Sequence, residues 1–181
     1  MREVKGTMFV VFAKTIRADK SGVYDALLTD EDKEIIAQRI LSVGWYPFET
    51  YKNCFNAVYK VEGKNDPEIC RQWGRINGEL TMTSIYQGAI KKGDPEGALN
   101  LFKMYYKNMF NFGEMIFDML SGNETIIKIK DFDANFEPYY NVVRGWMERF
   151  LELCVDKSVK SEFVSKSWRG DSDTKIKLRW D

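Results

Sequence analysis

Apolar residues recur at three- and four-residue spacing through most of the first 112 positions, a pattern that predicts amphipathic helices. One stripe follows Thr29 to Asp32, whose hydroxyl and carboxylate groups suit a helix start, and it ends at Gly44, the expected C-cap. A further helix start is expected at Pro47, which suits a first turn, and two more at Pro67 and Pro95, each of which stands between an aspartate and a glutamate.

After Gly113 the period changes mostly to two, which is typical of strands. Strands are expected at residues 114–120, 125–132, 159–168 and 175–180, with a helix at 142–154. The sequence therefore predicts an α+β fold, in which a helical N-terminal half packs on a four-stranded antiparallel sheet of order β-β-α-β-β. We expect a single domain over residues 1–181, with the helical half at about 1–112 and the sheet half at about 113–181.

The helix expected at residues 67–90 carries two interior glycines, Gly74 and Gly78. Each costs about 1 kcal/mol relative to alanine, so we expect either another backbone or a ligand to approach closely there. Aromatic side chains of this helix and the next would then line an apolar pocket. The candidate pocket residues are Trp73, Gly74, Tyr86, Phe102, Tyr105 and Phe110. The competing interpretation is that the same residues form plain, close-packed core.

The segment from Met8 to Phe12 is apolar on every side, so its period does not distinguish helix from strand. Such a segment requires burial on more than one side. It is either a central core element or a subunit interface. As an interface, it would place Met8, Phe9, Val11 and Phe12 between two copies of the chain.

Composition narrows the function classes. With 27 basic and 27 acidic residues the formal net charge is zero, so we expect neither nucleic acid nor an anionic membrane as a partner.

One sheet face could carry a row of basic side chains, which we interpret as solvated rather than anion-binding. The members of this row are Lys128, Lys130, Lys160, Lys166, Lys175, Lys177 and Arg179. No apolar run is long enough to cross a membrane and no leader is recognised, so a cytoplasmic location is expected.

Catalytic and metal-binding signals are weak. The chain has no histidine, which removes the usual general base, the usual zinc ligand and the histidine ligand of a haem. Its three cysteines, Cys54, Cys70 and Cys154, lack the spacing of a disulfide framework or a zinc site. We therefore expect no enzyme activity, no metal and no cofactor.

Several short sequence segments, and their order along the chain, resemble those of one superfamily. That superfamily unites haem nitric-oxide-binding (H-NOX) domains, 4-vinyl reductase domains and transport-particle subunits of vesicle tethering. Within it, the chain is most similar to a poorly characterised bacterial branch abundant in myxobacteria. The segments are Val4-Lys5-Gly6-Thr7, Trp45-Tyr46-Pro47-Phe48, Trp73-Gly74-Arg75, Tyr86 with Gly93-Asp94-Pro95, Arg144-Gly145-Trp146, and Trp168-Arg169-Gly170-Asp171 with Leu178-Arg179-Trp180. The resemblance implies a small-molecule-binding or assembly domain, often dimeric, with a pocket between helices and sheet.

The chain also departs from that pattern. It lacks the proximal histidine of the haem branch, and Ile129 to Asp133 does not match the family's Tyr-x-Ser-x-Arg motif for the haem propionates. Near the last hairpin, Ser165, Ser167 and Thr174 stand where the 4-vinyl reductase branch carries cysteines. Cys70 is only loosely comparable to the acylated cysteine of one transport-particle subunit.

Together these features predict a non-enzymatic domain that binds a small apolar ligand, or serves sensing or assembly, as a homodimer and without haem. The alternative is a purely structural protein–protein interaction module with a filled core.

Overall fold

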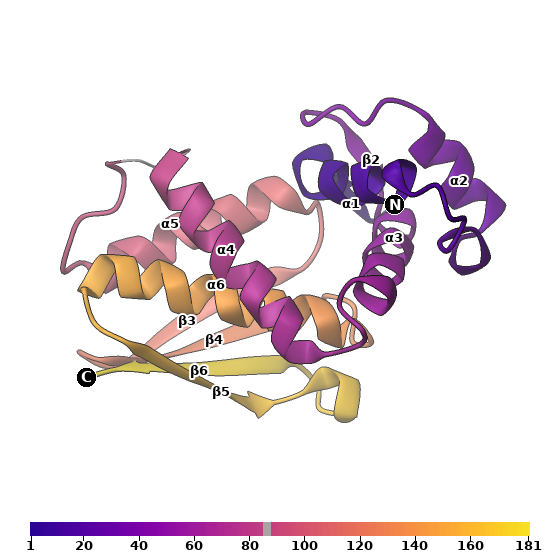
Figure 1. The fold of residues 1–181 in the computed structure, drawn as a ribbon. Coiled ribbons are helices and arrows are strands. Elements are labelled where there is room, and N and C mark those ends of the chain that lie inside the picture. Colours follow the sequence, from indigo (N-terminus) through magenta and orange to yellow (C-terminus); the bar gives the residue numbers. More distant parts are fainter. Residues whose placement is uncertain (85–87) are drawn as a thin grey trace. The chain divides into compact units, whose positions relative to one another are not determined.

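A computed structural model describes residues 1–84 and 88–181 of the chain (Figure 1). The candidate pocket residue Tyr86 lies outside the described residues. The chain forms two compact units. Unit 1 comprises Met1–Asp66 and Lys107–Phe112, and unit 2 comprises Pro67–Tyr106 and Gly113–Asp181. The expected division at residue 112 therefore differs from the observed grouping, because two long helices before it belong with the sheet. That the whole chain is one domain stays a prediction.

Unit 1 is mostly helical. Its elements are β1 (Glu3–Lys5), α1 (Gly6–Ala18), the short 3-10 helix η1 (Asp25–Leu27), α2 (Asp30–Ala37), β2 (Trp45–Pro47) and α3 (Phe48–Val61). Strands β1 and β2 pair antiparallel, with Val4 opposite Tyr46. The ambiguous segment Met8 to Phe12 is helical and lies within α1, where Phe9 makes edge-to-face contact with Tyr51 of α3 at 6.2 Å between ring centroids.

Helix α2 begins where the sequence predicts and ends earlier. Thr29 forms a reciprocal capping box with Asp32, in which each side chain accepts a hydrogen bond from the other's backbone N–H. The helix stops at Ala37, because Gln38 is already extended, so the predicted continuation to Gly44 is wrong. Val43, the last apolar residue of the predicted stripe, is 78% exposed, so the buried face does not extend to the predicted end of the helix.

Unit 2 contains the sheet. Its helices are α4 (Pro67–Ser84), α5 (Pro95–Met109, whose last residues belong to unit 1) and α6 (Glu137–Val155). Its strands are β3 (Glu114–Ser121), β4 (Glu124–Lys130), β5 (Val159–Ser165) and β6 (Thr174–Trp180), with the 3-10 helix η2 (Ser167–Arg169) before the last strand. The strand order is β3-β4-β6-β5 and all neighbours are antiparallel. The predicted β-β-α-β-β order and α+β class are confirmed.

Gly113 has a positive φ of 77°, which turns the chain from α5 into β3 as the change of period predicts. Helix α6 lies on one face of the sheet, and α4 packs on the other side of α6 (Figure 1). Ile127, Ile176 and Leu178 are fully buried on the covered face, as strict alternation along β4 and β6 requires. No helix in the described part of the chain is long and apolar enough to cross a membrane.

Candidate functional site

Helices α4 and α6 touch backbone to backbone because glycines stand at their crossing. A methyl group on Gly74 would overlap the carbonyl oxygen of Val142, and one on Gly145 would overlap the carbonyl oxygen of Arg71. Gly78 allows a similar approach to Trp146. Of the two explanations that the sequence left open for Gly74 and Gly78, close approach of another backbone is the one observed.

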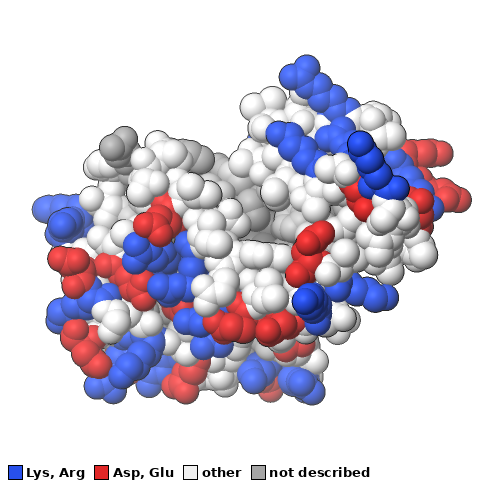
Figure 2. Space-filling model, viewed as in Figure 1, with Lys and Arg blue, Asp and Glu red and all other residues white. Residues whose placement is uncertain are grey.

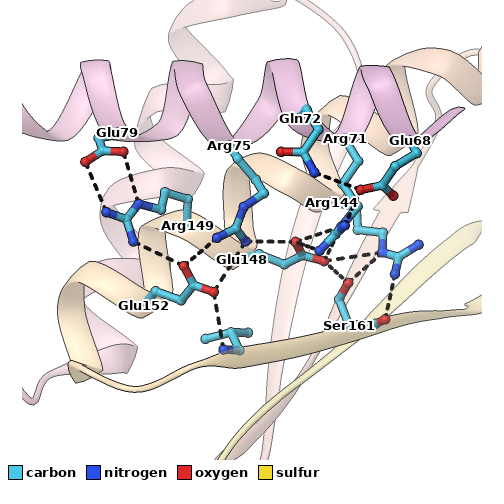
Figure 3. A network of polar contacts seen from close by, with 11 residues as sticks. Glu68, Arg71, Gln72, Arg75, Glu79, Arg144, Glu148, Arg149, Glu152 and Ser161 are labelled. Carbon is cyan, nitrogen blue, oxygen red and sulfur yellow. Dashed lines mark hydrogen bonds and ion pairs between the residues drawn. The ribbon is translucent and has the colours of Figure 1, made fainter. Parts of the chain in front are cut away.

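A charged network runs along this crossing, with Glu148 of α6 at its centre (Figure 3). The Glu148 side chain is fully buried. The Nε atom of Arg71 donates to both of its carboxylate oxygens, at 3.0 and 2.9 Å, and Nη1 of Arg75 donates to one of them at 3.1 Å. Ser161 of β5 donates a short hydrogen bond to the same carboxylate, and Arg144 lies 3.4 Å from it. Glu148 thus joins α4, α6 and the sheet.

Glu152, one helical turn further along α6, extends the network. Its carboxylate accepts hydrogen bonds from Arg75 at 2.7 Å and from Arg149 at 3.2 Å. Arg149 also donates to Glu79 of α4 at 3.0 Å, and at the other end Arg71 pairs with Glu68 at 2.5 Å. The arginines at positions 71, 75, 144 and 149 therefore balance the glutamates at positions 68, 79, 148 and 152.

These contacts shift the pKa of individual members of the network. Burial disfavours the Glu152 carboxylate, but hydrogen bonds and charge from Arg75 and Arg149 outweigh it and hold the pKa of Glu152 below its ordinary value. The hydrogen bond to Glu148 raises the pKa of Arg71. Each of these groups has a partner of opposite charge, so the arrangement supplies a clamp between elements rather than a poised acid or base.

Sequence reasoning did not find this site. Arg144, Glu148, Arg149 and Glu152 lie mostly away from the apolar side of the helix expected at residues 142–154, and such a position is typical of a solvated surface. The available signal was the pair Arg71 and Arg75 on a helix that also carries Gly74 and Gly78. Charged residues beside glycines that admit a second helix are candidates for burial at the crossing.

The candidate pocket residues are divided between the units. Phe102 and Tyr105 of α5 pack on Trp146 of α6, with ring centroids 4.4 and 5.5 Å apart, and Trp146 also stacks on Phe150 at 4.8 Å. Phe110 belongs to unit 1, where it lies 6.3 Å from the ring of Phe48. Of the remaining candidates, Trp73 is half-buried on α4 and Gly74 packs on α6.

The candidate interface residues lie along α1. Phe9 is 0% exposed and serves the core of unit 1, so it cannot contact a second copy while that unit is folded. Met8 and Phe12 are half-buried, and Val11 is 55% exposed. The interface stays a prediction, and Val11 is the residue that tests it.

The remaining candidates are structural. All three cysteines are buried, and burial raises the pKa of Cys54 to about 12. No group of histidine, cysteine, aspartate and glutamate side chains within residues 1–84 and 88–181 could hold a metal ion. Three lysines of the outer sheet face are paired with acids: Lys128 and Lys175 with Asp173, and Lys177 with Glu124. Basic and acidic side chains are also interspersed on the face seen in Figure 2.

No family model matches the sequence, and no curated protein matches it either. Several solved structures are similar to this chain. An H-NOX protein from S. oneidensis in the Fe(II)NO state is 8% identical, with a TM-score of 0.67 over 98% of this chain and 99% of that one. An Fe(II) unliganded H-NOX protein from K. algicida is 13% identical, with a TM-score of 0.63 over 98% and 96%.

A mutant H-NOX domain from T. tengcongensis is 20% identical, with a TM-score of 0.57 over 98% of this chain and 97% of that one. At these identities the likeness concerns the fold, and it extends over nearly the whole length of both chains. This chain has the α+β fold of H-NOX domains.

Proposed function

We propose that this chain is a sensory or assembly domain that binds a small apolar ligand, acts as a homodimer and works without haem. One observation carries the proposal: an H-NOX fold over 98% of the chain is formed by a sequence that contains no histidine. The fold favours a ligand-binding domain by analogy, and the missing histidine distinguishes this chain from the haem-binding branch of the superfamily that it resembles.

The donor groups of the chain do not fit a haem held through a proximal histidine. Imidazole is absent. Among other iron ligands, thiolate and phenolate must lose a proton, and burial raises the pKa of Cys54, Cys154 and Tyr106. For these three side chains, burial therefore disfavours the deprotonated form that binds iron.

The aromatic cluster of unit 2 is the surface that would hold an apolar ligand. Phe102 and Tyr105 of α5 meet Trp146 and Phe150 of α6 there. Aromatic side chains with few polar neighbours are typical of small-molecule sites. Trp146 follows Gly145, which packs on the backbone of Arg71, so a ligand that moves Trp146 would act directly on the α4–α6 crossing.

Native mass spectrometry of the purified chain tests the ligand and the oligomeric state together. We expect a dimer and an added mass that is lost under denaturing conditions. Titration with hemin tests the haem part: we expect only weak, heterogeneous absorbance changes. Stoichiometric uptake of one haem per chain with a sharp Soret band would contradict the proposal.

The alternative is an interaction module with a filled core, and one observation favours it. The ring of Trp146 lies 4.4 Å from that of Phe102 and 4.8 Å from that of Phe150, which is ordinary close packing. Mass spectrometry distinguishes the two functions, since this alternative predicts a chain without added mass.

A Phe102→Ala variant also distinguishes the ligand-binding domain from the interaction module. If the core is filled, the variant creates a cavity and lowers the free energy of unfolding by about 3–5 kcal/mol. If a ligand already occupies part of the cluster, the variant should instead change which ligand mass is retained.

A further inference from the structure

A short turn in unit 1 holds large apolar side chains out into solvent. It belongs to the loop that joins α2 to β2 along the outside of that unit (Figure 1). Val43 is 78% exposed, Leu41 is 48% exposed and Trp45, the first residue of β2, is 40% exposed. We call these three residues the apolar turn. Within the described part of the chain, only Met1 is a large apolar residue more exposed than Val43.

Backbone hydrogen bonds fix the shape of this turn. The N–H of Gly44 donates to the Leu41 carbonyl at 2.9 Å, which closes the turn. The turn in return caps the start of α1, since Gly6 donates to the Gly44 carbonyl at 2.9 Å and Thr7 donates to the Ser42 carbonyl at 3.0 Å. None of these bonds uses a side chain of the apolar turn. The exposed side chains are therefore held in an ordered loop, and a partner that covers them need not order it first.

The apolar turn lies among cations that lack acidic partners. The two chain segments that meet there, residues 4–18 and 35–48, contain four basic residues and no acidic one. These four cations are Lys5, Lys14, Arg17 and Arg39. The Lys5 ammonium lies 4.3 Å from the centre of the Trp45 ring, and Arg17 donates to the Gln38 carbonyl at 3.2 Å. Within residues 1–84 and 88–181, none of the four forms an ion pair. A chain of zero net charge thus has a local excess of positive charge at this turn.

We propose that the apolar turn inserts into the surface of a lipid bilayer with anionic head groups, and that the four cations bind those head groups. Apolar side chains that protrude beside basic ones suit the boundary between head groups and acyl chains, and tryptophan favours the same depth. The cations match the negative surface potential of such a bilayer. Our expectation of no anionic membrane partner rested on the net charge of the whole chain, which this turn does not share. The inference is independent of the ligand and the oligomeric state in the proposed function.

The aliphatic members of the turn favour lipid over other anionic partners. Single-stranded nucleic acid requires aromatic faces on which bases can stack. Leu41 and Val43 have none, and the Lys5 ammonium already lies over the ring of Trp45. An acidic soluble protein would pair with the cations without any need for the protruding Val43. A test must therefore separate the contribution of the apolar side chains from that of the charges.

Co-sedimentation of the purified chain with vesicles makes this separation. We expect binding to vesicles of phosphatidylcholine and phosphatidylglycerol that weakens as salt is added, and little binding to phosphatidylcholine alone. Val43→Ser removes an apolar side chain without a change of charge and should weaken binding about tenfold. Arg39→Gln removes one charge and should weaken it about fivefold. No binding to the mixed vesicles, or equal binding to both kinds, would overturn the proposal.

Matched controls carry the same kinds of change in unit 2. Met104→Ser alters a 63% exposed side chain of α5, and Lys157→Gln removes an exposed charge after α6. Both should bind as the unmodified chain does. Unchanged circular dichroism and thermal melting would verify that each variant is folded, and Leu41→Ser replaces Val43→Ser if that variant is not. Full binding by the folded serine variant of the turn would overturn insertion, and would assign the cations to a partner in solution.

Tryptophan fluorescence tests whether the turn enters the bilayer. Lipids with brominated acyl chains quench only tryptophans that reach the acyl region. Trp45 is exposed, and the other tryptophans are half-buried or buried, namely Trp73, Trp146, Trp168 and Trp180. We expect such vesicles to quench the unmodified chain, and a Trp45→Phe variant to lose most of the quenching while it still binds. Equal quenching of the two chains, or none in the unmodified chain, would overturn the proposal.

Discussion

Glu148 is the residue whose environment differs most from that of an ordinary surface glutamate. Its carboxylate is fully buried and is contacted by Arg71, Arg75, Arg144 and Ser161. Burial of an ionised group is tolerated only where partners replace the lost water. The network therefore depends on this one carboxylate more than on any of its arginines, because each arginine keeps a second contact.

Replacement of Glu148 by glutamine should destabilise the chain by about 3–5 kcal/mol, the usual cost of removing one partner from a buried charged pair. The change leaves the guanidinium groups of Arg71 and Arg75 close together without their shared anion. Urea-induced unfolding at neutral pH measures the loss.

Glu79→Gln is the matched control, because Glu79 belongs to the same network but is exposed to solvent. We expect little change in its unfolding midpoint. Equal effects of the two substitutions would contradict a central role for Glu148.

Glu152 gives the network a dependence on pH. Its pKa is held below the ordinary value of 4.5 in the folded chain, so its ionised form stabilises the fold. That contribution is fully present above the unfolded-state pKa and is lost as the pH falls through the folded-state pKa, below 4.5. Glu152→Gln should therefore be less stable than the unmodified chain at pH 7, and the difference should shrink at strongly acidic pH. Urea midpoints of both chains across this range provide the measurement, and a constant difference would contradict the assignment.

At the scale of elements, the α4–α6 crossing organises unit 2. Glycines from both helices allow the backbones to touch, and the charged network surrounds the point of contact (Figure 3). Close approach and ion pairing support each other, since the short arginine-to-glutamate distances require closely packed helices.

Gly145→Ala should cost about 1–3 kcal/mol, because its methyl group overlaps the Arg71 carbonyl and forces the helices apart. Gly122→Ala is a suitable control, since no atom of the described chain lies within 4 Å of a methyl group there. Thermal unfolding followed by circular dichroism compares the two. A loss at Gly122 as large as that at Gly145 would show that the effect is not one of helix contact.

At the scale of the whole molecule, each unit has an aromatic core of its own. Phe9, Phe48 and Tyr51 belong to unit 1, and Trp146 and Phe150 belong to unit 2. The chain passes between the units more than once, so neither is a continuous segment of sequence. Local stability can therefore differ between the units although both share one chain.

Phe9→Ala should raise amide hydrogen exchange mainly in α1 and α3, because the cavity lies in the core of unit 1. Phe150→Ala should do so mainly in α6 and the sheet. Each removes a fully buried ring and should cost about 3–5 kcal/mol. Exchange measured by mass spectrometry locates the response. A uniform rise over the whole chain in both variants would show that the units unfold as one, as the single-domain expectation implies.

The sequence by itself determined the fold class and most elements, because helix and strand periods are local properties. The Thr29–Asp32 capping box, the turn at Gly113 and the alternation from Lys175 to Trp180 each depend on a few neighbouring residues. The missing histidine is also a sequence fact, and it removes the histidine ligand of a haem without reference to any coordinates.

Only the tertiary structure decided which faces meet. Glu148 looks solvated along its own helix and becomes buried because α4, more than seventy residues earlier in the chain, crosses it. The same crossing assigned Gly74 to a backbone contact and left Ile76 and Leu80 exposed. Periodicity shows that a face is apolar or charged, but the free energy that buries it comes from a partner distant in sequence. The candidate site therefore emerged from the packing of elements and not from any motif.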